Sequence, residues 1–158
     1  MTMEDQQRDG YTLSTDKARL DVALIHDFLS NHSYWAQGRS QQVVQDAITH
    51  SLCFGVYKGD DQVGFARVVT DHATFAWVCD VFILEAHRGR GLGKWLIETV
   101  VAHPALQPPK LFLLATRDAH DLYRRYGGFE ALGSPERWMS RRHNSSTASR
   151  VGLQPCHG

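Results

Sequence analysis

The sequence has few cysteines, no hydrophobic run long enough to span a membrane and no surplus of charge. Its three cysteines, Cys53, Cys79 and Cys156, are odd in number and widely spaced. This pattern favours free thiols in a reducing compartment over a disulfide framework or a zinc site. No segment approaches the roughly 20 apolar residues of a membrane helix, and residues 1–10 lack the basic start and apolar stretch of a secretory signal. We therefore expect a cytoplasmic protein with no membrane partner.

The charges of the chain cancel, because 17 Lys and Arg residues stand against 17 Asp and Glu residues. A protein that coats nucleic acid or binds through a polybasic surface needs a positive surplus. We therefore expect no nucleic-acid partner. The histidines show no paired spacing of the kind that metal ligands adopt, so we also expect no metal.

The length of 158 residues suits one domain. Neither end of the chain shows apolar periodicity, so we expect residues 1–10 to be a disordered N-terminus and residues 141–158 to be a flexible basic tail. A single folded domain should occupy residues 11–140.

Hydrophobic periodicity predicts the elements of this domain. Apolar residues recur at helical spacing around 20–29, and the nearly continuous apolar run Phe75–Leu84 is typical of a central strand buried on both faces. The resulting order is β-α-α-β-β-β-α-β-α-β, a mixed α/β (α+β) sheet flanked by helices. The other predicted elements are a helix over Gln41–Thr49, strands over Leu52–Lys58, Val63–Thr70 and Lys110–Ala115, helices after Gly93 and over Asp118–Tyr126, and a final strand from Phe129 onward.

A glycine-rich loop between a strand and a helix is the most informative segment. In Arg88-Gly89-Arg90-Gly91-Leu92-Gly93-Lys94, the glycines allow a ligand to approach the backbone, and the N–H groups of the helix start can bind an anion such as a pyrophosphate. A dinucleotide fingerprint would need a glycine where Lys94 stands, and a P-loop would need Ser or Thr where Trp95 stands. Neither of these motifs fits.

The loop, read as Arg88-x-x-Gly91-x-Gly93 after a hydrophobic strand, resembles the acetyl-CoA-binding motif of the GNAT N-acetyltransferase superfamily. A second signature is similar too: Thr116 to Tyr123, followed by Gly127-Gly128-Phe129, resembles Asn-x-x-Ala-x-x-Leu-Tyr and its Gly-Phe pair. Thr116 stands where the family often has Asn, and the Gly-Phe pair lies one residue further along. This shift leaves open whether Tyr123 or Tyr126 points into the site.

The resemblance implies a role for each matching segment. Acetyl-CoA would lay its pyrophosphate on the loop and pair its pantetheine arm with the strand before it, where a bulge opens the sheet and a backbone N–H polarises the acetyl carbonyl. Tyr123 would protonate the departing thiolate as general acid. The cofactor-binding residues implied in this way are Val81, Phe82, Ile83, Arg88, Gly89, Arg90, Gly91, Leu92, Gly93, Lys94 and Thr116.

The acceptor amine must lose a proton before it attacks, so a carboxylate or a water chain should lie nearby. Asp80 is a lone carboxylate in an apolar strand and is the candidate that docks the ammonium and relays its proton; the alternative is that it pairs with Arg67. Tyr34 and Trp35 lie in the loop where this family usually frames its acceptor, and they could line an amine pocket or serve as core. The remaining candidates for the acceptor cleft are His26 and Phe75.

These features predict an acetyl-CoA-dependent N-acetyltransferase that transfers the acetyl group directly to a primary amine of a small molecule. The alternatives are a non-catalytic acyl-CoA-binding or regulatory domain of the same fold, and a peptide or protein N-acetyltransferase. A nucleotide-binding domain that uses the same anion cradle is a further alternative. Because dimers are common in the family, a homodimer is also an expectation.

Overall fold

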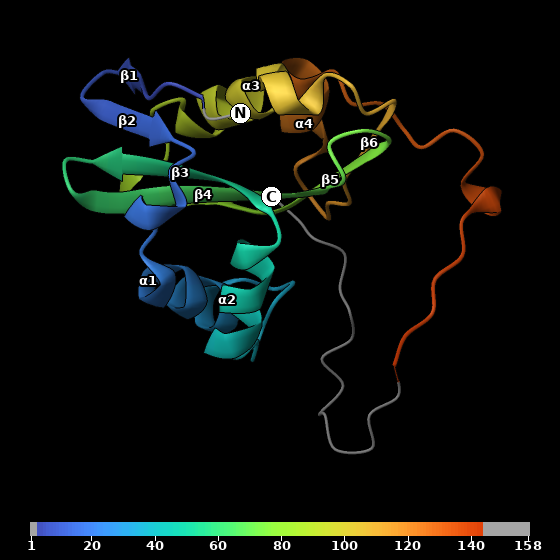
Figure 1. Cartoon of the computed structure of the whole chain (residues 1–158), viewed down its shortest axis with the longest axis horizontal. Coiled ribbons are helices and arrows are strands. Elements are labelled where there is room, and N and C mark those ends of the chain that lie inside the picture. The colour runs from blue at the N-terminus through green and yellow to red at the C-terminus, as the bar shows by residue number, and fades with distance from the viewer. Residues whose placement is uncertain (1–2, 144–158) are drawn as a thin grey trace.

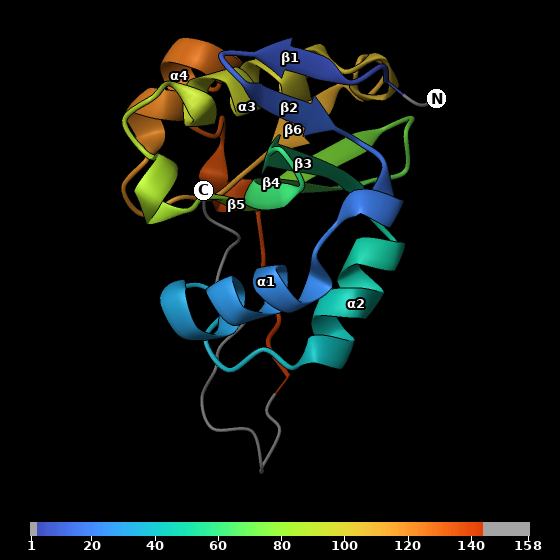
Figure 2. The ribbon, with the colours of Figure 1, turned by 90° about the vertical axis from the view of Figure 1, so that its left-hand side faces the viewer.

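The computed structural model describes residues 3–143. One six-stranded sheet runs in the order β1-β2-β3-β4-β5-β6, with α1 and α2 against one face and α3 and α4 against the other (Figures 1 and 2). The strands are β1 (Gln6–Arg8), β2 (Tyr11–Ser14), β3 (Leu52–Lys58), β4 (Asp61–Thr70), β5 (Phe75–Ile83) and β6 (Leu111–Leu113). The α-helices are α1 (Val22–Asp27), α2 (Gln41–Thr49), α3 (Leu92–Ala102) and α4 (His120–Gly127).

The two faces of the sheet carry separate hydrophobic clusters. Ile25 and Leu29 from the α1 side pack with Phe65 and Phe82, whereas Leu96 of α3 belongs to the cluster on the opposite face. All five of these side chains are buried. The continuous apolar run of β5 is therefore explained by burial on both faces, as the sequence predicts.

The sheet opens between its last two strands. Neighbouring strands from β1 to β5 are antiparallel, but β5 and β6 are parallel and pair only from Phe75 to Trp77. Beyond Trp77, β5 continues to Ile83 without β6 beside it. This opening leaves one edge of the second half of β5 available to a ligand.

A β-bulge lies in this second half of β5. Phe65 of β4 pairs with Phe82, and Arg67 pairs with Cys79, so Asp80 and Val81 together stand opposite a single residue. Asp80 has a φ of 53°, in the left-handed region that costs a non-glycine residue about 1 kcal/mol. The bulge thus redirects the backbone at the point where the sheet opens.

Two predictions about the ends of the domain differ from the structure. The predicted disorder of residues 1–10 is wrong for Gln6–Arg8, which pairs with β2 through a two-residue turn at Asp9 and Gly10. Both turn residues have positive φ, as a type I′ hairpin requires. The predicted strand from Phe129 onward is also wrong, since none forms between 129 and 143.

The predicted basic tail falls mostly outside the described part of the chain. Residues 141–143 have no helix or strand, and residues 144–158 lie beyond what the structure describes. Within residues 3–143, no helix is long and apolar enough to cross a membrane.

Candidate active site

The glycine-rich loop forms an open helix start. Gly89 and Gly91 have φ values of 78° and 77°, and a Cβ at either position would meet no neighbouring atom within 4 Å. The first helical hydrogen bond runs from the N–H of Trp95 to the carbonyl of Gly91, and among residues 3–143 no side chain caps the helix. The N–H groups of the first turn therefore stay available, and an anion is the ligand that they and the helix dipole favour.

Basic side chains surround this helix start. The Nε–H of Arg88 donates to the carbonyl oxygen of Ile83 at 2.9 Å, which ties the loop to the end of β5. Lys94 lies over the ring of Tyr126, 4.9 Å from its centroid. Arg90 is exposed. The predicted cofactor residues of the loop therefore gather at one helix end, directly beyond the open edge of β5.

The three predicted residues of β5 sit where the strand leaves β6. Val81 and Ile83 are buried in the α3-side cluster, and Phe82 stacks on Phe28 with ring centroids 4.0 Å apart on the opposite face. Because these side chains are anchored in the core on both faces, the backbone between them is held rigidly beside the opening of the sheet.

Tyr123 and Tyr126, between which the sequence could not choose, occupy different places. Tyr123 belongs to the core cluster and is 2% exposed, whereas Tyr126 is half-buried beside Lys94. Burial, with smaller effects of Tyr34 and Cys79, raises the pKa of Tyr123 far above that of a free tyrosine. Tyrosine is protonated at neutral pH even without such a shift, so the raised pKa does not distinguish Tyr123 from Tyr126 as a general acid.

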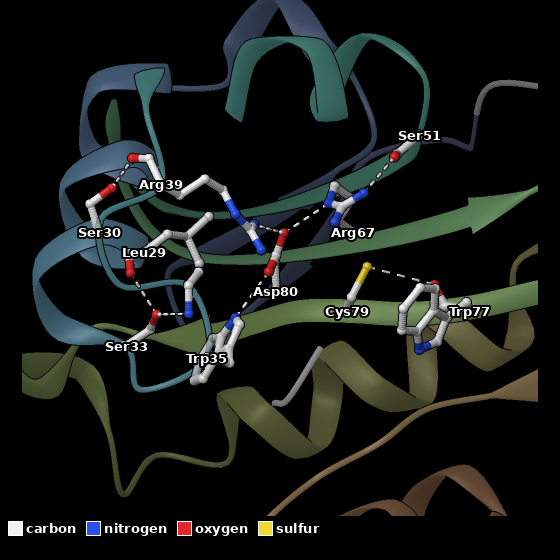
Figure 3. A network of polar contacts seen from close by, with 11 residues as sticks. Leu29, Ser30, Ser33, Trp35, Arg39, Ser51, Arg67, Trp77, Cys79 and Asp80 are labelled. Carbon is white, nitrogen blue, oxygen red and sulfur yellow. Dashed lines mark hydrogen bonds and ion pairs between the residues drawn. The ribbon is translucent and has the colours of Figure 1, made fainter. Parts of the chain in front are cut away.

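Asp80 lies at the centre of a buried polar network (Figure 3). Its Oδ2 accepts hydrogen bonds from Nε of Arg67 at 2.8 Å and from Nη1 of Arg39 at 2.9 Å, and its Oδ1 accepts from Nε1 of Trp35 at 2.9 Å. The side chain is 1% exposed. Burial alone would raise the pKa of Asp80, but Arg67 and Arg39 outweigh it and hold the pKa below its usual value.

This geometry favours the alternative in which Asp80 pairs with Arg67. A proton-relaying carboxylate needs access to the amine and a pKa near the working pH, and Asp80 has neither. Its second partner, Arg39, had no signal in the sequence. It lies in the irregular loop between two helices, and only the folded chain brings it to β5.

The two aromatic residues of the acceptor loop have different roles. Trp35 is 7% exposed and donates to Asp80, so it belongs to the core rather than to an open pocket wall. The hydroxyl of Tyr34 accepts a hydrogen bond from the backbone N–H of Arg117 at 3.2 Å. Thr116 accepts from the backbone N–H of Ala119 at 3.1 Å and so shapes the start of α4.

The structure does not bring Phe75 to the site. Phe75 begins β5 and Asp80 lies five residues further on, which at the strand rise separates them by about 16 Å. His26 lies on α1, but the cavity beside that helix is lined by its neighbours and not by His26. This cavity of about 410 Å³ is lined by Leu24, Asp27, Phe28, His32, Leu84, Glu85 and Arg88.

Comparison with known proteins identifies the chain. The acetyltransferase (GNAT) domain family matches residues 49–130. A protein of Gibberella zeae named "Putative acetyltransferase" is 32% identical over 136 residues, which cover 72% of this chain and 76% of that protein.

Two solved structures share the fold. A protein from Xanthomonas campestris, described as "a putative acetyltransferase belonging to the gnat family", is 49% identical and superposes with a TM-score of 0.82 over 85% of this chain and 94% of its own. A GNAT acetyltransferase from Elizabethkingia anophelis with acetyl-CoA bound is 11% identical, with a TM-score of 0.58 over 95% and 94% of the two chains. The chain belongs to the GNAT acetyltransferase family and is an N-acetyltransferase.

Proposed function

We propose that this enzyme transfers the acetyl group of acetyl-CoA directly to a primary amine of a small molecule. One observation carries the proposal. The uncapped N-terminus of α3 lies just beyond the end of β5, and the edge of β5 is not paired with β6 after Trp77. The helix N-terminus can bind a pyrophosphate, and the strand edge beside it can pair with the amides of an extended arm. Together they suit a ligand that carries both groups. The fold relative from Elizabethkingia anophelis carries acetyl-CoA.

The proposed reaction is acyl transfer in a ternary complex. The lone pair of the neutral amine attacks the acetyl carbonyl carbon, a C–N bond forms, and the C–S bond to coenzyme A breaks. A backbone N–H at the bulge of β5 would stabilise the negative charge that develops on the carbonyl oxygen. Tyr123, which is protonated at neutral pH as any tyrosine is, would give its proton to the departing thiolate. The amine's own proton leaves through water, since both oxygens of Asp80 are occupied.

The cavity beside α1 has a size that suits a small molecule. Its volume of about 410 Å³ lies within the range of small-molecule sites, and it combines the apolar walls of Leu24 and Phe28 with the carboxylates of Asp27 and Glu85. The cavity lies beside Leu84 and Arg88, at the loop end of β5 and not at the bulge, so we do not place the acceptor in it, and we do not place the acceptor on Asp80 either. The buried network of Asp80, Arg39 and Arg67 carries a net charge of +1, which would repel an ammonium group.

The cytoplasmic location and the homodimer stay predictions.

Calorimetric titration with acetyl-CoA tests the proposal. Gly91→Glu introduces a negative charge into the loop, and Gly59→Glu is its matched control. Gly59, in the turn between β3 and β4, also has a positive φ (60°) and open space around it. We expect micromolar binding by the wild type and by Gly59→Glu, and at least 100-fold weaker binding by Gly91→Glu.

Absence of binding to the wild type would overturn the cofactor assignment. With binding established, a thiol-release assay over primary amines, with basic peptides in parallel, tests the acceptor. Turnover with peptides alone would point to a protein or peptide acetyltransferase, and release with neither would point to a non-catalytic acyl-CoA-binding domain.

A further inference from the structure

Arg39 and Trp35 lie in the loop between α1 and α2, yet their side chains reach the middle of the sheet (Figure 3). We propose that they are positioning residues, which through Asp80 fix the acceptor loop (residues 33–40) to the β5 bulge. The loop and the backbone that binds the acetyl carbonyl would then be set as one unit. This inference rests on the proposed function, because that function places the acetyl group at the bulge.

The contacts show how the loop is joined to the strand. Two hydrogen bonds run from the loop to β5, one from Trp35 and one from Arg39, and both end on the carboxylate of Asp80. Within the loop, Ser33 accepts from the backbone N–H of Ala36 at 3.1 Å, and the Ser30 hydroxyl donates to the carbonyl oxygen of Arg39. The loop is thus braced internally and presents two donors to one acceptor group.

The same carboxylate holds the bulge. Asp80 adopts its left-handed conformation inside a buried strand, and such a conformation persists only where its surroundings fix it. Arg67 supplies the fixed side of this arrangement. It lies in β4, donates to Asp80 at 2.8 Å through Nε, and donates to the hydroxyl of Ser51 at 3.1 Å through Nη1.

Arg39 is the member of the network that can be changed with least damage to the core. Its side chain is 19% exposed, against 11% for Arg67. Without Arg39, Asp80 and Arg67 remain a neutral pair, so the variant leaves no unpaired buried charge. A substitution at Arg39 should therefore weaken the connection between the loop and the bulge while it leaves the stability of the sheet largely unchanged.

The test combines hydrogen exchange with binding of two ligands. Arg39→Met keeps the aliphatic stem and removes the guanidinium, and Arg39→Lys restores a charged donor. Arg124→Met is the matched control, since it breaks the exposed pair with Asp121 on α4. Amide exchange is followed in residues 33–40 and 79–82, and calorimetry compares coenzyme A with acetyl-CoA. Trp35→Phe, which removes one donor, serves the same purpose if Arg39→Met does not fold.

We expect exchange in Arg39→Met to rise at least about tenfold in both segments together, with Arg39→Lys intermediate and Arg124→Met unchanged. The wild type should prefer acetyl-CoA over coenzyme A about fivefold, the effect of one hydrogen bond to the carbonyl. Arg39→Met should lose this preference while its affinity for coenzyme A stays within about twofold. Faster exchange in residues 33–40 alone, with the preference kept, would overturn the inference. If the wild type binds neither ligand, the proposed function fails, and the exchange data still decide whether loop and bulge are coupled.

Discussion

Tyr34 and Arg117 are joined twice, by a hydrogen bond and by a cation–π contact. The backbone N–H of Arg117 donates to the Tyr34 hydroxyl at 3.2 Å, and the guanidinium carbon lies 3.6 Å from the centroid of the ring. The pair connects the acceptor loop to the segment before α4, across the open end of the sheet. The Arg117 guanidinium also occupies one face of the Tyr34 ring, a ring that the sequence suggested as a wall of an amine pocket.

Two substitutions at Tyr34 separate these contacts. Tyr34→Phe removes the hydroxyl, and because Arg117 is exposed, water can replace it, so we expect a loss of about 0.5–1 kcal/mol in the free energy of unfolding. Tyr34→Ala also removes the ring, which contacts both Arg117 and Trp35, and should cost about 2–3 kcal/mol. Urea unfolding measures both values. Equal losses in the two variants would show that the ring contributes nothing.

Tyr123→Phe should lower kcat by about 10²–10⁴-fold, the usual contribution of a general acid, with little change in acetyl-CoA affinity. Tyr126→Phe is the control, because Tyr126 lies outside the core beside Lys94. Steady-state thiol release with an active amine measures both. Since the pKa of Tyr123 is raised above that of an ordinary tyrosine, the alkaline fall in rate due to this group should lie above pH 10. Equal losses in both variants would remove Tyr123 from the mechanism.

Asp80→Asn should destabilise the fold by about 3–5 kcal/mol, because the buried guanidinium of Arg67 and the partly buried one of Arg39 lose their counter-charge. Asn has nearly the same shape and tolerates the left-handed conformation, so the loss reports charge and not backbone strain. Asp118→Asn, at an exposed ion pair, should change stability by at most about 0.5 kcal/mol. Chemical denaturation compares the two. A stable Asp80→Asn protein that has lost only kcat would restore Asp80 as the base.

His103 makes the fold sensitive to mild acid. It is 1% exposed, its Nδ1 accepts from the backbone N–H of Ala105, and its Nε2 has no hydrogen-bond partner in the described part of the chain. Burial lowers the pKa of His103 below the usual value near 6.5. The unfolded chain therefore binds the proton more readily, and the folded state loses stability as pH falls below about 6.5.

His103→Asn tests this assignment, because Asn can still accept from the N–H of Ala105. The free energy of unfolding of this variant should fall less steeply than that of the wild type between pH 7 and pH 5. His120→Asn, at an exposed position on α4, should follow the wild type. Parallel curves for His103→Asn and the wild type would assign the acid sensitivity to other groups.

The sequence predicted the local features of this protein well. The loop from Arg88 to Lys94 could be recognised because glycine spacing, basic residues and the following helix are all encoded in consecutive residues. Likewise, the long apolar run placed β5 correctly, since burial on both faces leaves a direct mark on composition. Which of Tyr123 and Tyr126 is buried could not be predicted, because it depends on how α4 is rotated against the sheet.

Non-local features could not be derived from local patterns. A bulge in this strand was expected only from the family resemblance, because its position at Asp80 is a shift in register between β4 and β5, and register is a property of two strands together. Arg39 meets Asp80 across 41 positions of sequence, so no local pattern could pair them. The strand β1 was missed for another reason. Its polar residues pair through the backbone, and the Asp9-Gly10 turn was the signal that could have revealed it.

The left-handed backbone of Asp80 also limits how this family member can vary. Glycine would accept the conformation but would leave the two arginines without a negative charge, and glutamate would keep the charge on a backbone that it tolerates poorly. A single substitution at this position is therefore costly whichever residue replaces it. These constraints favour a joint change at positions 39, 67 and 80 over a single one. We therefore expect relatives that keep this bulge to keep all three residues.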